Sequence, residues 1–191
     1  STSSPTSATT CLSTSTPEPS AAAPAEAALI AAGLTYRVVR HPPARSLAEA
    51  AALRGIEPRD IVKTLVVRRG ADDYLFVLVP GDREIAWPKL RAHLGVSRLS
   101  MPDAEAAFVA TGYRRGTITP FGSRVAWPVV ADASLAGHTI SLGAGEPGAT
   151  VLIEADAVLA ALSADLADVT DPTATNATSA SLSPPRGRLD A

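Results

Sequence analysis

The 191-residue sequence predicts one mixed α+β domain whose sheet is at least partly antiparallel. Two strongly apolar runs, 61–67 and 74–79, are separated by a short turn that contains Gly70, and such a pair favours antiparallel neighbours. Segments with helix-capping signals alternate with these and other strand-like runs. A chain of this length, 46% hydrophobic and 4% aromatic, can bury one core of ordinary size.

Helix boundaries follow from capping residues, taken in chain order. Gly33 stops the first helix, and Ser46 begins the second, with Glu49 at the spacing of a capping box. Pro88 begins the third helix, and Gly95 lies just past its end. The predicted helices cover residues 26–32, 47–54, 88–94, 102–110 and 156–162.

Strands are predicted where β-branched and aromatic residues gather between turn signals. The first strand ends at His41, because two prolines follow it. The predicted strands cover residues 36–40, 61–67, 74–79, 84–87, 96–99, 126–131, 139–142 and 150–153. The segments 112–122 and 143–148 are rich in glycine, and we expect them to be ordered loops between these elements.

Composition divides the chain into a globular part at residues 23–170 and two tails. Residues 1–22 and 171–191 consist largely of Ser, Thr, Ala and Pro, which cannot bury a core, so we expect both tails to be disordered. The lone cysteine, Cys11, falls in the first tail, which excludes an internal disulfide framework and fits a reducing cytoplasm.

Charge and hydropathy narrow the class of partner. The formal net charge is −2, so the chain has no global basic field for DNA, and any contact with nucleic acid must be local. No run approaches the roughly 20 consecutive apolar residues that a membrane span requires. We therefore expect a cytoplasmic protein without a membrane partner.

Lys63 is the most unusual residue of the predicted sheet. Only two of the seventeen basic residues are lysines, and this one lies in an apolar run that predicts a buried, central strand. An unpaired ammonium there would cost several kcal/mol, so it should face a cleft, meet an anion or have a lowered pKa. The plainer alternative is a lysine at a strand edge whose ammonium reaches solvent.

The glycine-rich loops are the other candidate site, because glycine lets main-chain N–H groups approach phosphate or carbonyl oxygens closely. Ordinary turns are the alternative, and neither loop matches a P-loop or a dinucleotide-binding fingerprint. His41, His93 and His138 do not have the spacing of metal ligands. We expect neither a metal nor another cofactor.

Four motifs together resemble the YbaK/EbsC family of aminoacyl-tRNA deacylases, which are related to the editing domain of bacterial prolyl-tRNA synthetase. They are His41-Pro42-Pro43-Ala44 with Ser46, the run 60–67, the loop 111–122 and the loop 143–148. The resemblance spans about residues 25–165. It implies a curved, mainly antiparallel mixed sheet that forms a barrel-like core flanked by helices.

The resemblance also implies an activity: metal-independent hydrolysis, in trans, of the ester that joins a small, wrongly attached amino acid to tRNA. On this basis Lys63 and Gly116 are the expected catalytic residues. The expected substrate-binding residues are His41, Thr64, Thr119, Pro120, Gly143, Gly145 and Thr150. The expected partner is the acceptor end of aminoacyl-tRNA, and a synthetase such as prolyl-tRNA synthetase is a second candidate.

Several alternatives stay open. The fold could serve as a non-catalytic module that binds aminoacyl-tRNA or a synthetase, or as a small-molecule or nucleotide-binding domain. Departures from the family leave the amino acid undecided, because Thr150 replaces an Asp of the cysteine-clearing branch and Thr64 replaces an Asn of the alanine-clearing branch. Cys, Ala, Ser and Thr all remain candidates.

Overall fold

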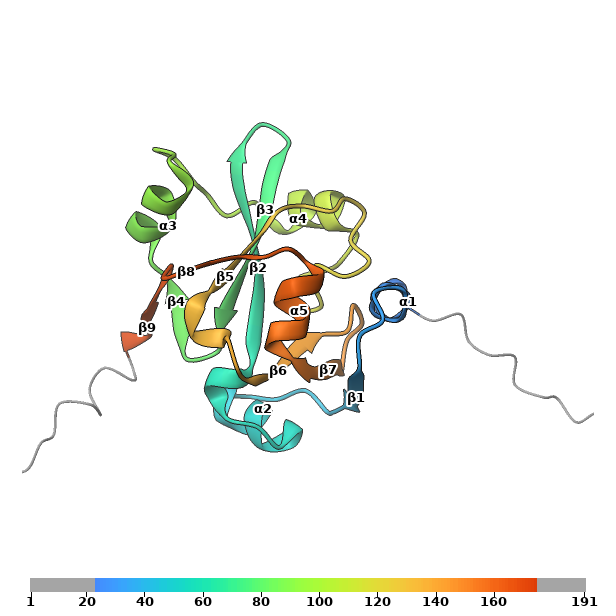
Figure 1. Ribbon diagram of the computed structural model, residues 1–191. Coiled ribbons are helices and arrows are strands. Elements are labelled where there is room, and N and C mark those ends of the chain that lie inside the picture. The colour runs from blue at the N-terminus through green and yellow to red at the C-terminus, as the bar shows by residue number, and fades with distance from the viewer. Residues whose placement is uncertain (1–22, 175–191) are drawn as a thin grey trace, which may run out of the picture.

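The computed structural model describes residues 23–174 (Figure 1). The helices in this range are α1 (Pro24–Ala31), α2 (Leu47–Arg54), α3 (Trp87–Leu94), α4 (Ala104–Thr111) and α5 (Ala155–Ala161). The strands are β1 (Tyr36–Arg40), β2 (Val62–Gly70), β3 (Asp73–Pro80), β4 (Arg83–Ile85), β5 (Val129–Asp132), β6 (Thr139–Gly143), β7 (Ala149–Glu154), β8 (Asp165–Ala167) and β9 (Thr170–Pro172). None of these helices is long and apolar enough to span a membrane.

The strands of residues 23–174 form three sheets. One sheet has the order β1-β7-β6 and is antiparallel, and a second has the order β2-β3-β5-β8. In the second sheet β2 and β3 are antiparallel, whereas β5 runs parallel to both β3 and β8. The third sheet is the antiparallel pair β4-β9. The predicted mixed α+β fold is confirmed, but the sheets are not closed into a barrel.

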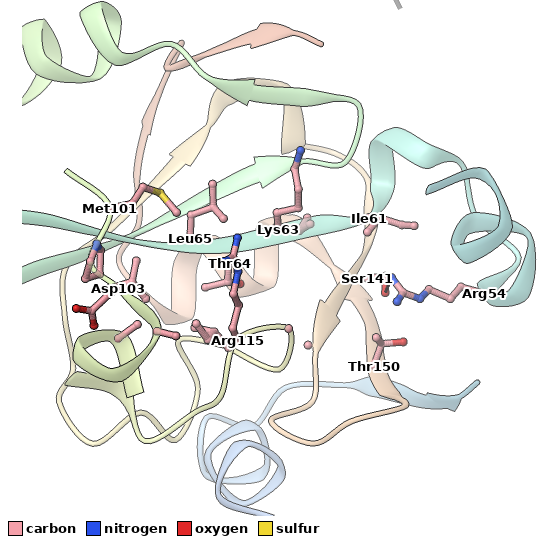
Figure 2. Close-up of a pocket in the computed structure, with 18 residues that line it drawn as sticks. Arg54, Ile61, Lys63, Thr64, Leu65, Met101, Asp103, Arg115, Ser141 and Thr150 are labelled. Carbon is pink, nitrogen blue, oxygen red and sulfur yellow. Dashed lines mark hydrogen bonds between the residues drawn. The ribbon is translucent and has the colours of Figure 1, made fainter. Parts of the chain in front are cut away.

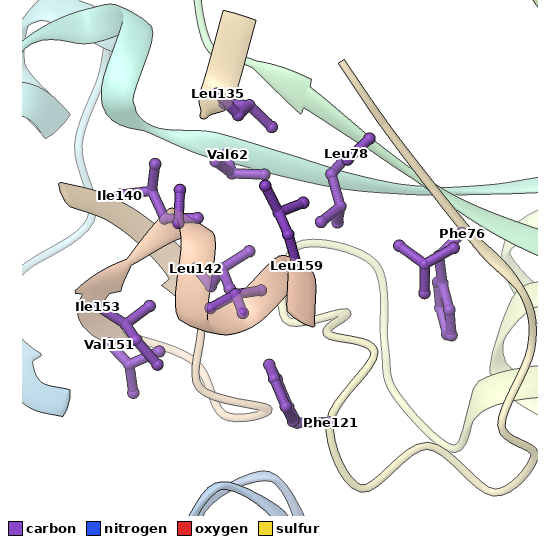
Figure 3. Close-up of a cluster of buried hydrophobic side chains, with 14 of the residues drawn as sticks. Val62, Phe76, Leu78, Phe121, Leu135, Ile140, Leu142, Val151, Ile153 and Leu159 are labelled. Carbon is purple, nitrogen blue, oxygen red and sulfur yellow. The ribbon is translucent and has the colours of Figure 1, made fainter. Parts of the chain in front are cut away.

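Strand β3 is the centre of the domain, because its side chains are buried on both faces. Phe76 and Leu78 point into the larger apolar cluster, which also holds Leu142 of β6 and Leu159 of α5 (Figure 3). Val77 joins a second cluster on the other face of the sheet. Both layers of the core are therefore anchored to one strand.

The strand that carries Lys63 was predicted to be central, and this prediction is wrong. β2 lies at the edge of its sheet, paired along its length with β3 alone. On its other side there are two isolated bridges, Arg68 to Ser100 and, just before the strand, Ile61 to Ser141, which links the first two sheets. An edge position next to a turn gives a lysine polar neighbours that a central strand would not offer.

Most boundaries follow the predicted caps. The Ser46 Oγ accepts a hydrogen bond from the Glu49 N–H (3.1 Å), and Gly55 ends α2 with a φ of 69°. Residues 96–99 do not form the predicted strand, although Ser100 just beyond them bridges Arg68. The short strands β8 and β9 were not predicted. The last two residues of β9, 171 and 172, fall in the predicted C-terminal tail. Residues 1–22, which include Cys11, and residues 175–191 lie outside the described range.

Candidate functional site

A cavity of about 470 Å³ opens beside β2 (Figure 2). Its walls come from β2, the start of α4, the Gly116 loop and the facing ends of β6 and β7. Five of the residues predicted for the site line it: Lys63, Thr64, Gly116, Gly143 and Thr150. Residues far apart in the sequence thus meet around one hollow, at the place where the first two sheets approach each other.

Lys63 lines the cavity, but its ammonium is directed at the turn between β3 and β4. Its Nζ donates hydrogen bonds to the main-chain oxygens of Gly81 (3.0 Å) and Arg83. Figure 2 shows Lys63 on one side of β2 and Thr64 on the other, as the two-residue period of a strand requires. Lys63 also borders an adjoining hollow of about 330 Å³. It therefore stands on the wall between two open spaces.

The surroundings of Lys63 shift its proton equilibrium. Burial lowers the pKa of its ammonium, and this effect outweighs the carboxylates of Asp82 and Glu84, which act in the opposite direction. Of the three settings expected for this lysine, a cleft and a lowered pKa agree with its position at the cavity and with the effect of burial. Two main-chain oxygens satisfy two of its three N–H donors, which leaves one donor for another partner.

The two glycine-rich loops meet at the cavity. A Cβ at Gly143 would lie 3.1 Å from the main-chain oxygen of Ile118 and 3.3 Å from that of Thr117, so only glycine lets β6 approach the Gly116 loop this closely. Gly116 itself has a φ of 92°, which favours glycine, and open space where a side chain would begin. The Gly116 N–H has no hydrogen-bond partner within residues 23–174.

Two threonine hydroxyls at the cavity lack partners. The Oγ1 atoms of Thr64 and Thr150 are both buried, and neither makes a hydrogen bond within the described chain. Thr150 is only 6% exposed. A buried hydroxyl without a partner costs about 1–3 kcal/mol, so these two groups are suited to contact a ligand.

Four other predicted residues do not line this cavity. Thr119 and Pro120 are buried residues of the loop 112–122. Gly145 packs against the ring of Tyr113, where a Cβ on the glycine would lie 2.7 Å from Cε1 of the ring. His41 is one step removed, because its Nε2 lies 3.2 Å from Nη2 of the cavity residue Arg54. Their contact with substrate stays a prediction.

Sequence reasoning missed several residues that line the cavity, chief among them Arg54, Ser141 and Asp103. Asp103 is the N-cap of α4, and its Oδ1 accepts from the Ala106 N–H at 2.8 Å. Arg115, next to Gly116, also borders the cavity. The sequence held a signal for Asp103, the capping pattern, but that signal concerns the helix and says nothing of a site.

The described residues offer no obvious place for a metal ion. No three His, Cys, Asp or Glu side chains gather at a suitable distance within residues 23–174. The donors around the cavity are instead hydroxyls, main-chain N–H groups and cations. Such a set is suited to bind oxygen atoms of an organic substrate.

Comparisons with solved structures agree with this fold. The chain superposes on the hypothetical protein APE2540 with a TM-score of 0.68 at 30% identity, over 75% of this chain and 96% of that one. A structure described as a candidate trans-editing enzyme for prolyl-tRNA synthetase gives a TM-score of 0.70 at 28% identity, over 76% and 93% of the two chains.

Comparisons of sequence point to the same family. The proline–tRNA ligase of Thermosipho africanus is 37% identical over 89 residues, which cover 47% of this chain and 16% of that enzyme. The ligase of Geobacter sp. is 34% identical over 107 residues, which are 56% and 18% of the two chains. The chain thus spans less than a fifth of these relatives. The family model of the aminoacyl-tRNA editing domain matches residues 41–161, and the chain belongs to that family.

Proposed function

We propose that this protein hydrolyses, in trans, the ester of tRNA that carries a small, wrongly attached amino acid. The observation that carries the proposal is the meeting of Lys63, Thr64, Gly116, Gly143 and Thr150 around one cavity. Membership of the editing-domain family supports the class of reaction. Action in trans, a cytoplasmic location and docking to prolyl-tRNA synthetase are further parts of the proposal.

The reaction needs groups that stabilise negative charge on the ester oxygen. A water molecule attacks the carbonyl carbon, the bond to the ribose oxygen breaks, and a proton passes to that oxygen, which leaves the tRNA with a free terminal hydroxyl. The Gly116 N–H, which has no partner within residues 23–174, is suited to donate to the developing oxyanion. A fixed main-chain donor of this kind contributes on the order of 3 kcal/mol to transition-state stabilisation.

Lys63 acts in this proposal as a fixed positive charge that positions the substrate. Its remaining N–H can donate to a phosphate or ester oxygen, while Gly81 and Arg83 hold the side chain in place. The cation need not exchange a proton during the reaction. Positioning by a held side chain is effective because it removes the entropy cost of orienting the substrate.

The size of the cavity supports a small aminoacyl group. About 470 Å³ lies toward the lower end of the usual range for ligand sites, and the terminal adenosine of tRNA must share this space. An apolar wall that only excludes larger groups discriminates modestly, by a factor of roughly 10–200 per methylene. We therefore expect activity on several small amino acids.

One observation favours a second candidate, a module that binds the aminoacylated end without hydrolysing it. The one carboxylate that lines the cavity within residues 23–174, Asp103, already caps α4, and no histidine lines the cavity. The cavity lining within the described part of the chain thus offers no evident general base. In our first proposal the substrate's own amine or hydroxyl must orient the attacking water.

A deacylation panel separates the two candidates. tRNAs mischarged with Ala, Cys, Ser or Thr are incubated with the purified chain, and loss of the aminoacyl ester is compared with binding of the same tRNAs. Turnover of at least one of them supports the enzyme. Binding without turnover on all four would leave only the binding module, with affinity that falls about 0.7–0.9 log units per tenfold rise in salt for each phosphate contacted.

A further inference from the structure

Arg54 is a half-buried cation at one end of the cavity, and it has no acidic partner among residues 23–174. It lies in the last turn of α2, and its side chain crosses toward β6 (Figure 2). Nη1 donates to Ser141 Oγ at 3.3 Å, and Nη2 lies 3.2 Å from His41 Nε2. The Nε atom is buried and has no partner within the described chain. The hydrogen-bond partners of the Arg54 guanidinium are therefore a serine hydroxyl and a histidine nitrogen.

The histidine contact favours one arrangement of protons. His41 Nδ1 lies 3.0 Å from the main-chain oxygen of Pro42, so it carries the hydrogen and donates to that oxygen. Nε2 then keeps its lone pair and accepts from Arg54. In this arrangement His41 holds the guanidinium without cancelling its charge.

The charge of Arg54 remains uncompensated at this end of the cavity. Burial lowers the pKa of the guanidinium, yet an arginine keeps its proton at any physiological pH. The charged groups that line the cavity are three cations, Arg54, Lys63 and Arg115, and one carboxylate, Asp103. Figure 2 shows Asp103 at the opposite end from Arg54. The cavity is therefore positive in a chain whose net charge is −2.

Two neighbouring strands bring hydroxyls to this part of the cavity: Ser141 contacts the guanidinium, and Thr150 lies on β7, paired with Gly143 of β6. Ser141 of β6 is 1% exposed, and because its Oγ accepts from Arg54, its own hydrogen is free to donate. Thr150 of β7 is 6% exposed, and its Oγ1 has no partner within residues 23–174. Both residues line the cavity. A buried cation with an unused Nε and two available hydroxyl donors is a set of groups that matches an oxyanion.

We propose that Arg54, Ser141 and Thr150 form a binding subsite for an oxyanion, the shared chemistry of a phosphate and a carboxylate. The identity of the ligand rests on the proposed function. On an aminoacylated tRNA end the anion has two sources, a phosphate of the terminal nucleotide or a carboxylate on the amino-acid side chain. Binding at this subsite does not depend on turnover, so it can be measured by itself.

Four stable analogues distinguish the sources. Each is 3′-amino-3′-deoxyadenosine joined by an amide to Ala or Asp, with or without a 5′-phosphate, and affinities are measured by isothermal titration calorimetry. Arg54→Gln is expected to weaken binding of the anion-bearing analogues about 10- to 100-fold and to leave the Ala analogue without phosphate unchanged. A loss confined to the phosphorylated pair assigns the phosphate, and a loss confined to the Asp pair assigns the carboxylate.

Two further variants distinguish a loss of the subsite from a loss of folding. Thr150→Val keeps the shape of the side chain and removes its hydroxyl, so it should show the same selective loss in smaller measure, about 3- to 10-fold. Arg45→Gln, an exposed arginine just before α2, is the matched control and should bind all four analogues like the unaltered chain. Thermal unfolding of each variant confirms that it folds.

Affinities of Arg54→Gln that match those of the unaltered chain for all four analogues, or an equal loss on all four, would overturn the subsite. The outcome is independent of catalysis. If the unaltered chain deacylates tRNA while Arg54→Gln binds normally, the subsite fails and the proposed function stands. If selective anion binding is found without deacylation, the subsite stands and the proposed hydrolysis fails.

Discussion

Lys63 donates a hydrogen bond from Nζ to the main-chain oxygen of Gly81, 3.0 Å away, and this contact fixes a charge of β2 to the turn after β3. The turn is held in its own right, because Gly81 is packed against the main-chain oxygens of Pro58 and Ile61. The lysine is therefore positioned by backbone that cannot easily move. Its place at a sheet edge does not make it a freely moving surface residue.

Gly81→Ala should destabilise the protein and disturb Lys63 together. The new Cβ would meet the Pro58 oxygen at less than contact distance and lie 2.7 Å from Leu47 Cδ1. Overpacking of this kind costs about 1–3 kcal/mol in the free energy of unfolding. Chemical denaturation measures it, with Gly70→Ala as control, since a Cβ there has only Asp73 Cβ at 3.9 Å. Equal stability of the two variants would contradict the packing described.

The pKa values of the two lysines should be shifted in opposite directions from the ordinary value for lysine. Burial lowers the pKa of Lys63, whereas the hydrogen bonds that Lys89 donates to Asp171 and Asp168 raise the pKa of Lys89. With the lysines reductively methylated with ¹³C, NMR should show the Lys63 signal titrating at the lower pH. A charge at Lys63 that binds substrate would then be lost, as pH rises, before the ordinary lysine range near 10.4 is reached. Coincident titration of the two signals would refute this assignment.

Asp132 should make the fold sensitive to acid. Burial alone would raise its pKa, but hydrogen bonds from Ser134, Thr170 and Val169 outweigh burial and lower it. A carboxyl whose pKa is lowered by folding stabilises the protein above its unfolded pKa of about 3.9, and this contribution is lost as pH falls through the folded value.

The Asp132→Asn variant isolates this contribution. The amide has one acceptor oxygen, so it cannot accept from Ser134 on one side and from Val169 and Thr170 on the other, as the two carboxylate oxygens do. The free energy of unfolding at neutral pH should therefore fall by about 1–3 kcal/mol. Denaturation curves between pH 3 and pH 7 should also show a weaker acid dependence than in the unaltered chain. An unchanged pH dependence would show that other carboxyls carry the effect.

Gly143→Ala should impair the site more than the fold. Its Cβ would press on the main-chain oxygens of Ile118 and Thr117 and move the Gly116 loop by a few tenths of an ångström. A displaced oxyanion donor should lower kcat/KM for deacylation roughly 10- to 100-fold. Thermal unfolding is measured beside the activity. A large fall in stability with activity retained in the folded fraction would contradict a role of this contact in the site.

The sequence predicted the elements that local signals define. Ser46 and Gly55 bound α2 by capping chemistry, and the turn at Gly70 defines the hairpin of β2 and β3. β8 and β9 are three residues each and form only through distant partners, β5 and β4, so no local pattern marks them. The position of β2 at the sheet edge was missed for the same reason, since apolar content does not reveal the number of neighbours.

The site was predictable in part. Lys63 and the glycine loops carry unusual local chemistry, a charge in an apolar strand and a concentration of glycine, which can be recognised without knowledge of the fold. Arg54 carries no such signal, because a cation in the last turn of a helix is already explained by the helix dipole. Its reach to Ser141, 87 residues away in the chain, depends on tertiary packing alone.

The central claim is that Lys63 serves hydrolysis of mischarged tRNA, and the two lysines of this chain provide the direct measurement. Deacylation of a tRNA mischarged with a small amino acid is compared for the unaltered chain, Lys63→Ala and Lys89→Ala, each checked for folding. Lys89 pairs with Asp168 and Asp171, away from the cavity. We predict a loss of about 100-fold or more in kcat/KM for Lys63→Ala and a change within about twofold for Lys89→Ala. An unaltered chain without activity, or equal activity in all three proteins, would contradict the account.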